Sequence, residues 1–146
     1  MKGTYILTVE LKKDLRMKIG KLGSINFLKG YYCYVGSALG KSVNLENRIG
    51  RHKRLNREKS GKLHWHIDYF LVNPNVDILR IDEINSNKRM ECKISQRIEQ
   101  AAEYSIHNFG CSDCNCKSHF HYFKNRNLLE NQLEVIKNEN FNSSSG

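Results

Sequence analysis

The chain has 146 residues, of which 39% are hydrophobic and 27% charged, and Lys and Arg outnumber Asp and Glu by 24 to 15. This length predicts one domain that buries a core without disulfide bonds, and no apolar run is long enough to cross a bilayer. Because no signal peptide opens the sequence, we expect a cytoplasmic protein without membrane contact.

The first predicted elements are strands. Residues 3–11 alternate with the period of a strand and place Tyr5 on a mostly apolar face. Residues 16–28 hold two short apolar runs around glycines and predict a hairpin. Residues 30–37 predict the next strand, on which Tyr34 and Gly36 share a face.

A basic helix is predicted next. Asn44 is suited to cap a helix over residues 45–58, along which four residues recur at helical spacing: Leu45, Ile49, His52 and Leu55. From Arg48 to Lys62 the chain carries seven Lys and Arg residues and a single acid. Such clustering favours a surface that faces phosphate groups, and nucleic acid is the commonest polyanion.

The second half of the chain mixes both element types. The pattern of residues 63–72 is ambiguous between strand and helix. A strand is predicted over 76–84, a helix over 88–104, a short strand near 119–123, and a last helix that carries Leu128, Leu129, Leu133 and Ile136. We therefore expect an α/β (α+β) fold: a small, mostly antiparallel central sheet flanked by helices, forming one domain over 1–140 with a disordered tail at 141–146.

Four side chains could carry chemistry if the two tyrosine strands pair. Tyr5 and Tyr34 would then lie on one face, beside Gly36, whose lack of a Cβ lets another group approach closely. Arg48 and His52 stand one helical turn apart near the apolar seam of their helix. A fixed guanidinium suits phosphate oxygens, although strand tyrosines and basic helices are often structural.

The order of these parts resembles the GIY-YIG nucleases. Gly3-Thr4-Tyr5, then Tyr34-Val35-Gly36, then the 44–52 segment with its arginine and histidine, follow that family's signature, and Glu91 matches its metal-binding glutamate. The segments WHIDYFL, SALG and CSDCNCKSH further resemble a little-characterised, stand-alone branch, a domain of unknown function. Some members of that branch are fused to a DNA-repair glycosylase.

The resemblance implies a Mg²⁺-dependent (or Mn²⁺-dependent) endonuclease. Tyr5 would orient or deprotonate the attacking water with help from Tyr34, and Arg48 would stabilise charge on phosphorus. His52 would hold a phosphate oxygen or relay a proton. Glu91 would bind the metal ion; in isolation, a glutamate in a first helical turn commonly serves the helix dipole instead.

Two further groups are candidate metal ligands. His64, His66 and Asp68 would share a face on a strand and could hold a metal, whereas a helix, which the family comparison favours, would turn Trp65, Tyr69 and Val72 inward. Cys111, Cys114, Cys116 and His119 are candidate zinc ligands, because the chain's five cysteines read as reduced thiols or metal ligands rather than disulfides. A reduced loop without metal is the alternative.

The first functional hypothesis is therefore an endonuclease that acts on DNA in repair, recombination or defence. Six residues are expected to contact nucleic acid: Arg51, Lys53, Arg54, Arg57, His64 and His66. The alternative is a non-catalytic nucleic-acid-binding module on the same scaffold, and a structural zinc protein is a third interpretation. RNA stays open as a substrate, and a homodimer or a repair-protein partner is compatible with the small size.

Overall fold

A computed structural model of the chain describes residues 1–39, 44–111 and 116–139, so the expected tail at 141–146 lies outside the described residues. A five-stranded sheet occupies the centre, in the order β5-β1-β4-β7-β6, and every neighbouring pair is antiparallel. Its strands are β1 (Gly3–Leu11), β4 (Gly30–Ala38), β5 (Val76–Asn85), β6 (Tyr104–Ser105) and β7 (Phe120–Phe123). The expected mixed α/β fold with an antiparallel sheet is confirmed.

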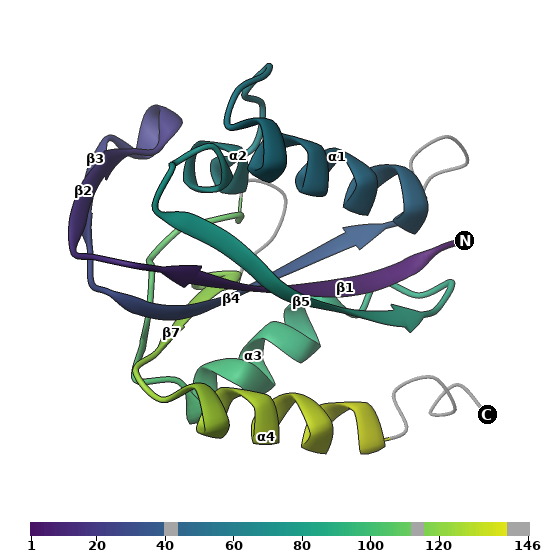
Figure 1. The fold of residues 1–146 in the computed structure, drawn as a ribbon. Helices are drawn as coiled ribbons and strands as arrows, with labels where there is room; N and C mark the ends of the chain where they lie inside the picture. Colours follow the sequence, from purple (N-terminus) through teal and green to yellow (C-terminus); the bar gives the residue numbers. More distant parts are fainter. Residues whose placement is uncertain (40–43, 112–115, 140–146) are drawn as a thin grey trace.

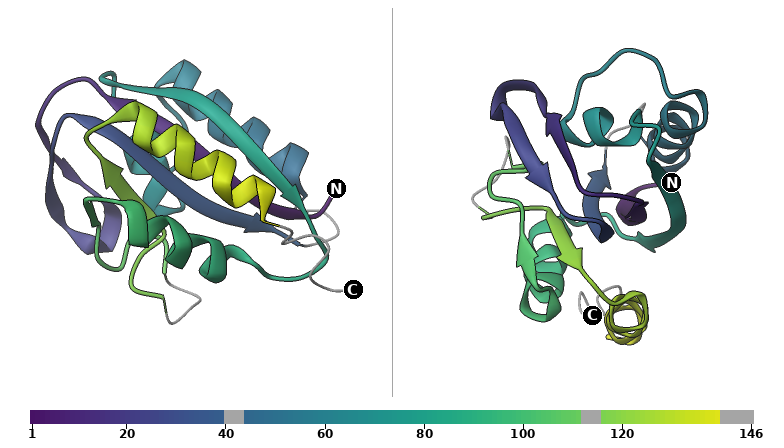
Figure 2. Two further views of the ribbon diagram at one scale, coloured as in Figure 1. Left: turned by 90° about the horizontal axis from the view of Figure 1, so that it is seen from below. Right: turned by 60° about the vertical axis from the view of Figure 1, so that its left-hand side comes forward.

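Helices cover both faces of this sheet. In Figure 1, α1 (Leu45–Glu58) and α2 (His66–Leu71) lie above the sheet, and α3 (Glu91–Ala101) and α4 (Arg126–Asn138) lie below it. Both views of Figure 2 show the same layered arrangement. Within the described residues, no helix has the length and apolarity that a bilayer crossing requires.

The interior strand β1 is buried on both faces, and the sheet divides the core in two. Its odd-numbered side chains, from Tyr5 to Leu11, pack with Leu45 and Ile49 of α1. Ile6 packs on the other face against Ile94 of α3 and the inner side of α4. The side-chain alternation of a strand therefore distributes neighbouring residues between two hydrophobic layers.

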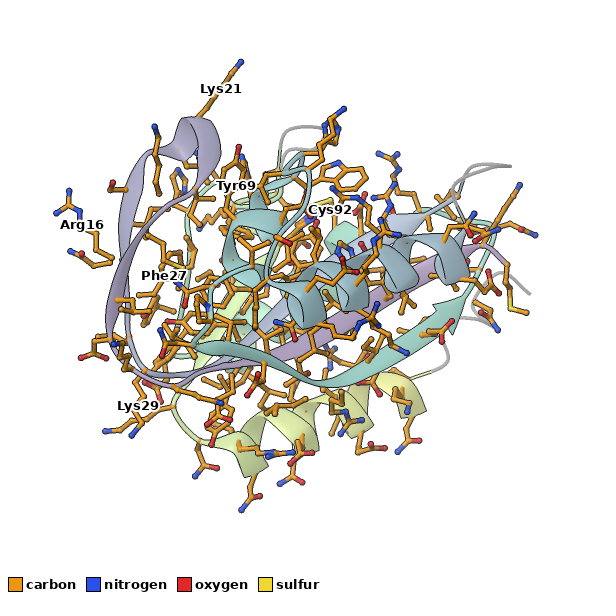
Figure 3. The ribbon with its side chains drawn as sticks, turned by 45° about the horizontal axis from the view of Figure 1, so that its top comes forward. Arg16, Lys21, Phe27, Lys29, Tyr69 and Cys92 are labelled. Carbon is orange, nitrogen blue, oxygen red and sulfur yellow. A yellow bond between two sulfur atoms is a disulfide. The ribbon has the colours of Figure 1, made fainter. Side chains whose placement is uncertain are left out.

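A separate hairpin closes one end of the molecule. β2 (Leu15–Lys18) and β3 (Ser24–Phe27) pair antiparallel, as expected for residues 16–28, and a short 3₁₀ turn at Gly20–Leu22 connects them. Figure 3 shows Arg16 and Lys21 extending outward from this hairpin and Phe27 turned toward the sheet. Phe27 is buried among the aromatic rings of the core.

The helix α1 has the predicted bounds because its ends are specified locally. Asn44 Oδ1 accepts a hydrogen bond from the Asn47 amide at 2.8 Å, which caps the first turn. Lys59 ends the helix in the left-handed conformation with φ 58°. The predicted seam of α1 is buried in full, and His52 lies within it.

The helix α3 is shorter than the predicted span of 88–104. It begins at Glu91, after the exposed Lys88 and Arg89, and ends before Ala102, whose backbone is extended. The Glu103 amide donates instead to the Tyr122 carbonyl at 2.9 Å, so this segment joins the sheet edge that includes β6. The last residues of the predicted helix, 102–104, therefore lie along the sheet edge instead of continuing α3.

The segment left ambiguous by pattern forms the helix α2, and its inward face was predicted in part. Trp65 and Tyr69 pack against the core as expected but are only half-buried, whereas the fully buried side chains are those of Ile67, Phe70 and Leu71. Leu128 of α4 belongs to the predicted apolar set but is exposed.

Candidate functional site

The two tyrosine strands pair as expected and bring the phenols together. Tyr5 of β1 stands directly opposite Gly36 of β4, and its ring covers that glycine so closely that a Cβ there would lie 2.5 Å from Tyr5 Cζ. The ring centroids of Tyr5 and Tyr34 are 6.3 Å apart. Tyr5 is completely buried and Tyr34 is 7% exposed, so both phenols belong to the core.

His52 is joined to this pair by a buried hydrogen bond. The Tyr5 hydroxyl lies 2.7 Å from His52 Nε2. Burial lowers the pKa of His52 to about 3, and burial raises the pKa of Tyr5 well above its ordinary value, so both groups are neutral at pH 7. His52 is only 1% exposed, which leaves it unable to touch a phosphate oxygen directly. The contact that His52 makes at this site is the hydrogen bond with Tyr5.

Arg48 lies beside the phenols on the same helix. Its guanidinium carbon is 4.1 Å from the centre of the Trp65 ring, a cation–π contact that holds the charged group in place. Burial raises the pKa of Tyr5 and of Tyr34, whereas the positive charge of Arg48 lowers the pKa of both. The cation of Arg48 therefore acts on both hydroxyls. Trp65 was not among the site residues predicted from the sequence. The presence of a large aromatic residue soon after a basic helix could have indicated a cation–π partner.

Glu91 approaches from the opposite layer of the molecule. It is the first residue of α3, its side chain is 12% exposed, and its charge adds to the burial that raises the pKa of both Tyr5 and Tyr34. Glu91 Oε2 lies 3.7 Å from His119 Nδ1. The charge of Glu91 therefore acts on both phenols from the other layer of the molecule.

The short length of β7 makes this approach possible. β7 pairs with β4 only over Tyr31–Tyr34, and the next β4 amide, that of Val35, donates to the His119 carbonyl at 2.9 Å. No strand in the described part of the chain pairs with β4 beyond this point on that edge. Gly110 fills part of the space, because a Cβ there would lie 3.1 Å from Tyr34 and 3.2 Å from His119.

The predicted nucleic-acid contacts divide into two groups. Lys53, Arg54 and Arg57 are exposed on α1, and Arg54 and Arg57 border an open hollow of about 540 Å³ on its outer surface. Arg51 also borders this hollow, but its guanidinium is bound to the buried carboxylate of Asp68 at 2.7 and 2.9 Å. Arg51 is thus held as a structural ion pair.

The two histidines of the α2 region are placed differently from each other. His64 is exposed, with its ring against the edge of Trp65. His66 Nδ1 accepts a hydrogen bond from the Gly110 amide at 2.9 Å, so it fixes the loop next to Tyr34.

Asp68 does not form a metal triad with these histidines. Burial raises the pKa of Asp68, but hydrogen bonds from Arg51 and from the amides of Trp65 and His64 outweigh burial and leave that pKa below its ordinary value. Those donors engage both carboxylate oxygens.

The cysteines form a different group from the predicted one. Cys116 and His119 come together with Cys92 of α3, and one donor atom from each lies within 4.8 Å of the others. The sulfur atoms of Cys92 (Figure 3) and Cys116 lie at disulfide distance, contrary to the expectation of unpaired thiols. Cys111 Sγ contacts the Phe109 carbonyl at 3.5 Å, and Cys114 lies outside the described residues. Sequence spacing missed Cys92 because 24 positions separate it from Cys116.

The fold and its candidate site define a mixed α/β protein that gathers two phenols, a guanidinium and a carboxylate at one end of an antiparallel sheet. The chain belongs to the family described as Domain of unknown function DUF123, whose model matches residues 4–141. No curated protein and no solved structure matched the chain.

Proposed function

We propose that this protein is a metal-dependent endonuclease of the GIY-YIG type that hydrolyses phosphodiester bonds in DNA. The observation that carries the proposal is the convergence of Tyr34, Arg48 and Glu91, which belong to three separate elements, around the Tyr5–His52 hydrogen bond. Placing a cation and a carboxylate beside two buried phenols does not stabilise the fold, because removing charged groups from water costs free energy. A catalytic role would explain why these groups are there.

Tyr34 orients the attacking water, since the Tyr5 hydroxyl is already hydrogen-bonded to His52. Tyr5 is a positioning residue: it is fully buried, bonded to His52 and in contact with Arg48. Because the pKa of each phenol is raised by burial, each hydroxyl stays protonated at neutral pH and acts by hydrogen bonding. Arg48, steadied by Trp65, stabilises the negative charge that develops on the phosphorus oxygens.

Glu91 fits a hard divalent cation such as Mg²⁺ or Mn²⁺. Its carboxylate is largely buried, and its nearest cationic partner, Arg89, stands 3.8 Å away rather than at hydrogen-bond distance. One carboxylate completed by waters is typical of Mg²⁺ bound next to a phosphate. Such an ion, when bound, polarises the phosphate and favours departure of the leaving oxygen.

The exposed cations of α1 would supply the contacts to the DNA backbone. Lys53, Arg54 and Arg57 are exposed side chains on one helix, and His64 lies exposed beside Trp65. Contacts of this kind position a duplex without reading its sequence. Repair or processing of damaged or branched DNA, alone or with a partner protein, is the role proposed for such an enzyme.

The test is a cleavage assay with Mg²⁺ or Mn²⁺ on branched, flapped, nicked and plain duplex DNA, with single-stranded RNA as a second substrate class. Arg48→Ala and Glu91→Gln should each lower the rate at least a hundredfold, and Tyr34→Phe should cost more than Tyr5→Phe. Matched controls are Arg16→Ala on the hairpin and Glu99→Gln two turns along α3, and both should cut like the wild type. Equal cutting by Arg48→Ala and Arg16→Ala would exclude the proposed catalytic role.

A non-catalytic nucleic-acid-binding module is the second candidate, because the basic hollow on α1 does not require the catalytic cluster. Both functions predict binding that weakens with salt. They differ in cleavage: a binding module would retain duplex with the same affinity in the Glu91→Gln variant, and no metal ion would convert the wild type into a nuclease.

A further inference from the structure

We infer that Cys92, Cys116 and His119 form a binding site for Zn²⁺, separate from the Mg²⁺ position proposed at Glu91. Their donor atoms come from three places: the first turn of α3, the loop before β7, and the residue immediately before β7. Both cysteines are half-buried and His119 is 2% exposed, so the group is sheltered from solvent. Thiolate and imidazole are the ligands that zinc prefers in proteins.

The distance between sulfur and nitrogen fits a tetrahedral centre. Zn–S bonds of about 2.3 Å and Zn–N bonds of about 2.0–2.1 Å, at the tetrahedral angle, place the two donor atoms about 3.6 Å apart. The separation of Cys92 Sγ and His119 Nε2 is 3.6 Å. This distance suits a hydrogen bond to sulfur and equally suits two ligands of one zinc ion.

The second ring nitrogen of His119 faces a carboxylate. Nδ1 lies 3.7 Å from Glu91 Oε2, within ion-pair reach but beyond hydrogen-bond distance, while Nε2 faces the cysteine sulfur. Metal-ligating histidines commonly direct their other N–H to a carboxylate or a backbone carbonyl, which fixes the tautomer and the ring orientation. Glu91 is near enough to take this role if the ring and the carboxylate approach each other when zinc binds.

A disulfide between Cys92 and Cys116 is the competing state, because their sulfur atoms lie at disulfide distance and their Cα atoms are 6.0 Å apart. The imidazole nitrogen near Cys92 is compatible with either state, and in the dithiol state the two sulfur atoms separate so that both can bind one zinc ion. In the dithiol form, binding of Zn²⁺ displaces the two thiol protons and forms two Zn–S bonds, with no change in oxidation state. Three protein ligands leave a fourth position for water or another ligand.

The metal would anchor the start of α3. This helix begins without a side-chain cap, at Met90 and Glu91. Zinc bound by Cys92, Cys116 and His119 would link the first turn of α3 to the residues before β7. It would also restrict the position of Glu91, which precedes Cys92 in the chain and lies beside His119. The link to catalysis rests on the proposed function; the zinc site itself does not.

Metal content tests the site directly. The full chain, purified with a phosphine reductant and without chelators, should contain about one zinc per chain by elemental mass spectrometry. Cys92→Ser and Cys116→Ser should lose it, and Glu91→Gln should weaken zinc affinity about tenfold relative to Glu99→Gln. Cys33→Ser is the matched control, because that buried thiol contacts Thr8 and a hydroxyl can keep the contact. Stoichiometric zinc in a Cys92→Ser/Cys116→Ser double variant would overturn the site.

Cobalt gives a measurement that needs no variant. Co²⁺ added to the reduced, metal-free wild type should produce thiolate-to-cobalt charge-transfer absorption, which zinc then abolishes. Absence of that absorption, with zinc content near zero, would overturn the inference. So would alkylation mass spectrometry showing that the Cys92–Cys116 pair stays oxidised in the presence of the reductant. None of these readouts involves nucleic acid, so a chain that binds zinc without cutting DNA would contradict only the proposed function.

Discussion

Replacing Gly36 with alanine is the most direct test of how the site is built. The added Cβ would lie 2.5 Å from both Cζ and Oη of Tyr5. Carbon atoms in contact prefer about 3.5–4.0 Å, so the end of the Tyr5 ring must move by about 1 Å. That movement breaks the 2.7 Å contact with His52 and displaces the phenol from Arg48.

The expected cost follows from these two effects. Overpacking typically costs about 1–3 kcal/mol, and the lost hydrogen bond about 1 kcal/mol, so Gly36→Ala should lower the free energy of unfolding by about 2–4 kcal/mol. For a domain of this size the melting temperature should fall by about 4–16 °C. If the proposed nuclease activity is present, cleavage should fall by up to about a hundredfold, because a 1 Å displacement misaligns the groups that Tyr5 holds.

Calorimetry and urea denaturation measure the effect, with Gly50→Ala as the control. A Cβ at Gly50, on the outer face of α1, meets no atom within 4 Å, so alanine there should stabilise the helix by up to about 1 kcal/mol. In a Tyr5→Phe background, Gly36→Ala should cost less, because the hydrogen bond to His52 is already absent. A Gly36→Ala protein as stable as the wild type would refute the close packing of Tyr5 on this glycine.

Three further predictions concern charge. Arg51→Ala leaves the buried carboxylate of Asp68 without its cation and should lower the free energy of unfolding by about 3 kcal/mol in urea, whereas the exposed Arg54→Ala should change it by less than about 0.5 kcal/mol; similar losses would show that the ion pair is unimportant. Burial holds the pKa of His52 at about 3, below the value of about 6.5 in the unfolded chain, so its contribution to stability is complete above about pH 6.5 and is lost as the pH falls toward 3. His52→Gln should therefore flatten the stability–pH slope by about 1.4 kcal/mol per pH unit between about pH 6 and 4, and parallel slopes would contradict a buried neutral ring. Replacing both Arg54 and Arg57 with alanine should reduce the slope of log Kobs against log salt for duplex DNA by about 1.8, measured by fluorescence anisotropy; an unchanged slope would place the phosphates elsewhere.

Local signals explain why parts of the fold were predictable. The helix α1 carries its own cap at Asn44 and an apolar seam of full length, so its bounds and its buried residues followed from pattern alone. The strands β1 and β4 alternate clearly, which fixed the shared face of Tyr5 and Tyr34. In these elements, local preference and tertiary packing agree.

The remainder depends on contacts between distant segments. The two-residue strand β6 has no periodicity of its own and exists because Glu103 and Ser105 lie against β7. The ring of Trp65 belongs to the site only because α2 packs beside Arg48. Cys92 joins Cys116 and His119 because α3 crosses the sheet next to β7, and no spacing rule within the sequence encodes that crossing.

The layered arrangement also has a dynamic consequence. The phenols and the guanidinium belong to the upper layer with α1, and Glu91 belongs to the lower layer with α3. A fluctuation that detached the first turn of α3 would withdraw the acidic group while the cationic helix stayed folded. On the proposed function, such a partly opened molecule would still hold nucleic acid but could not cut it; amide exchange that is faster near Glu91 than along α1 would be its signature.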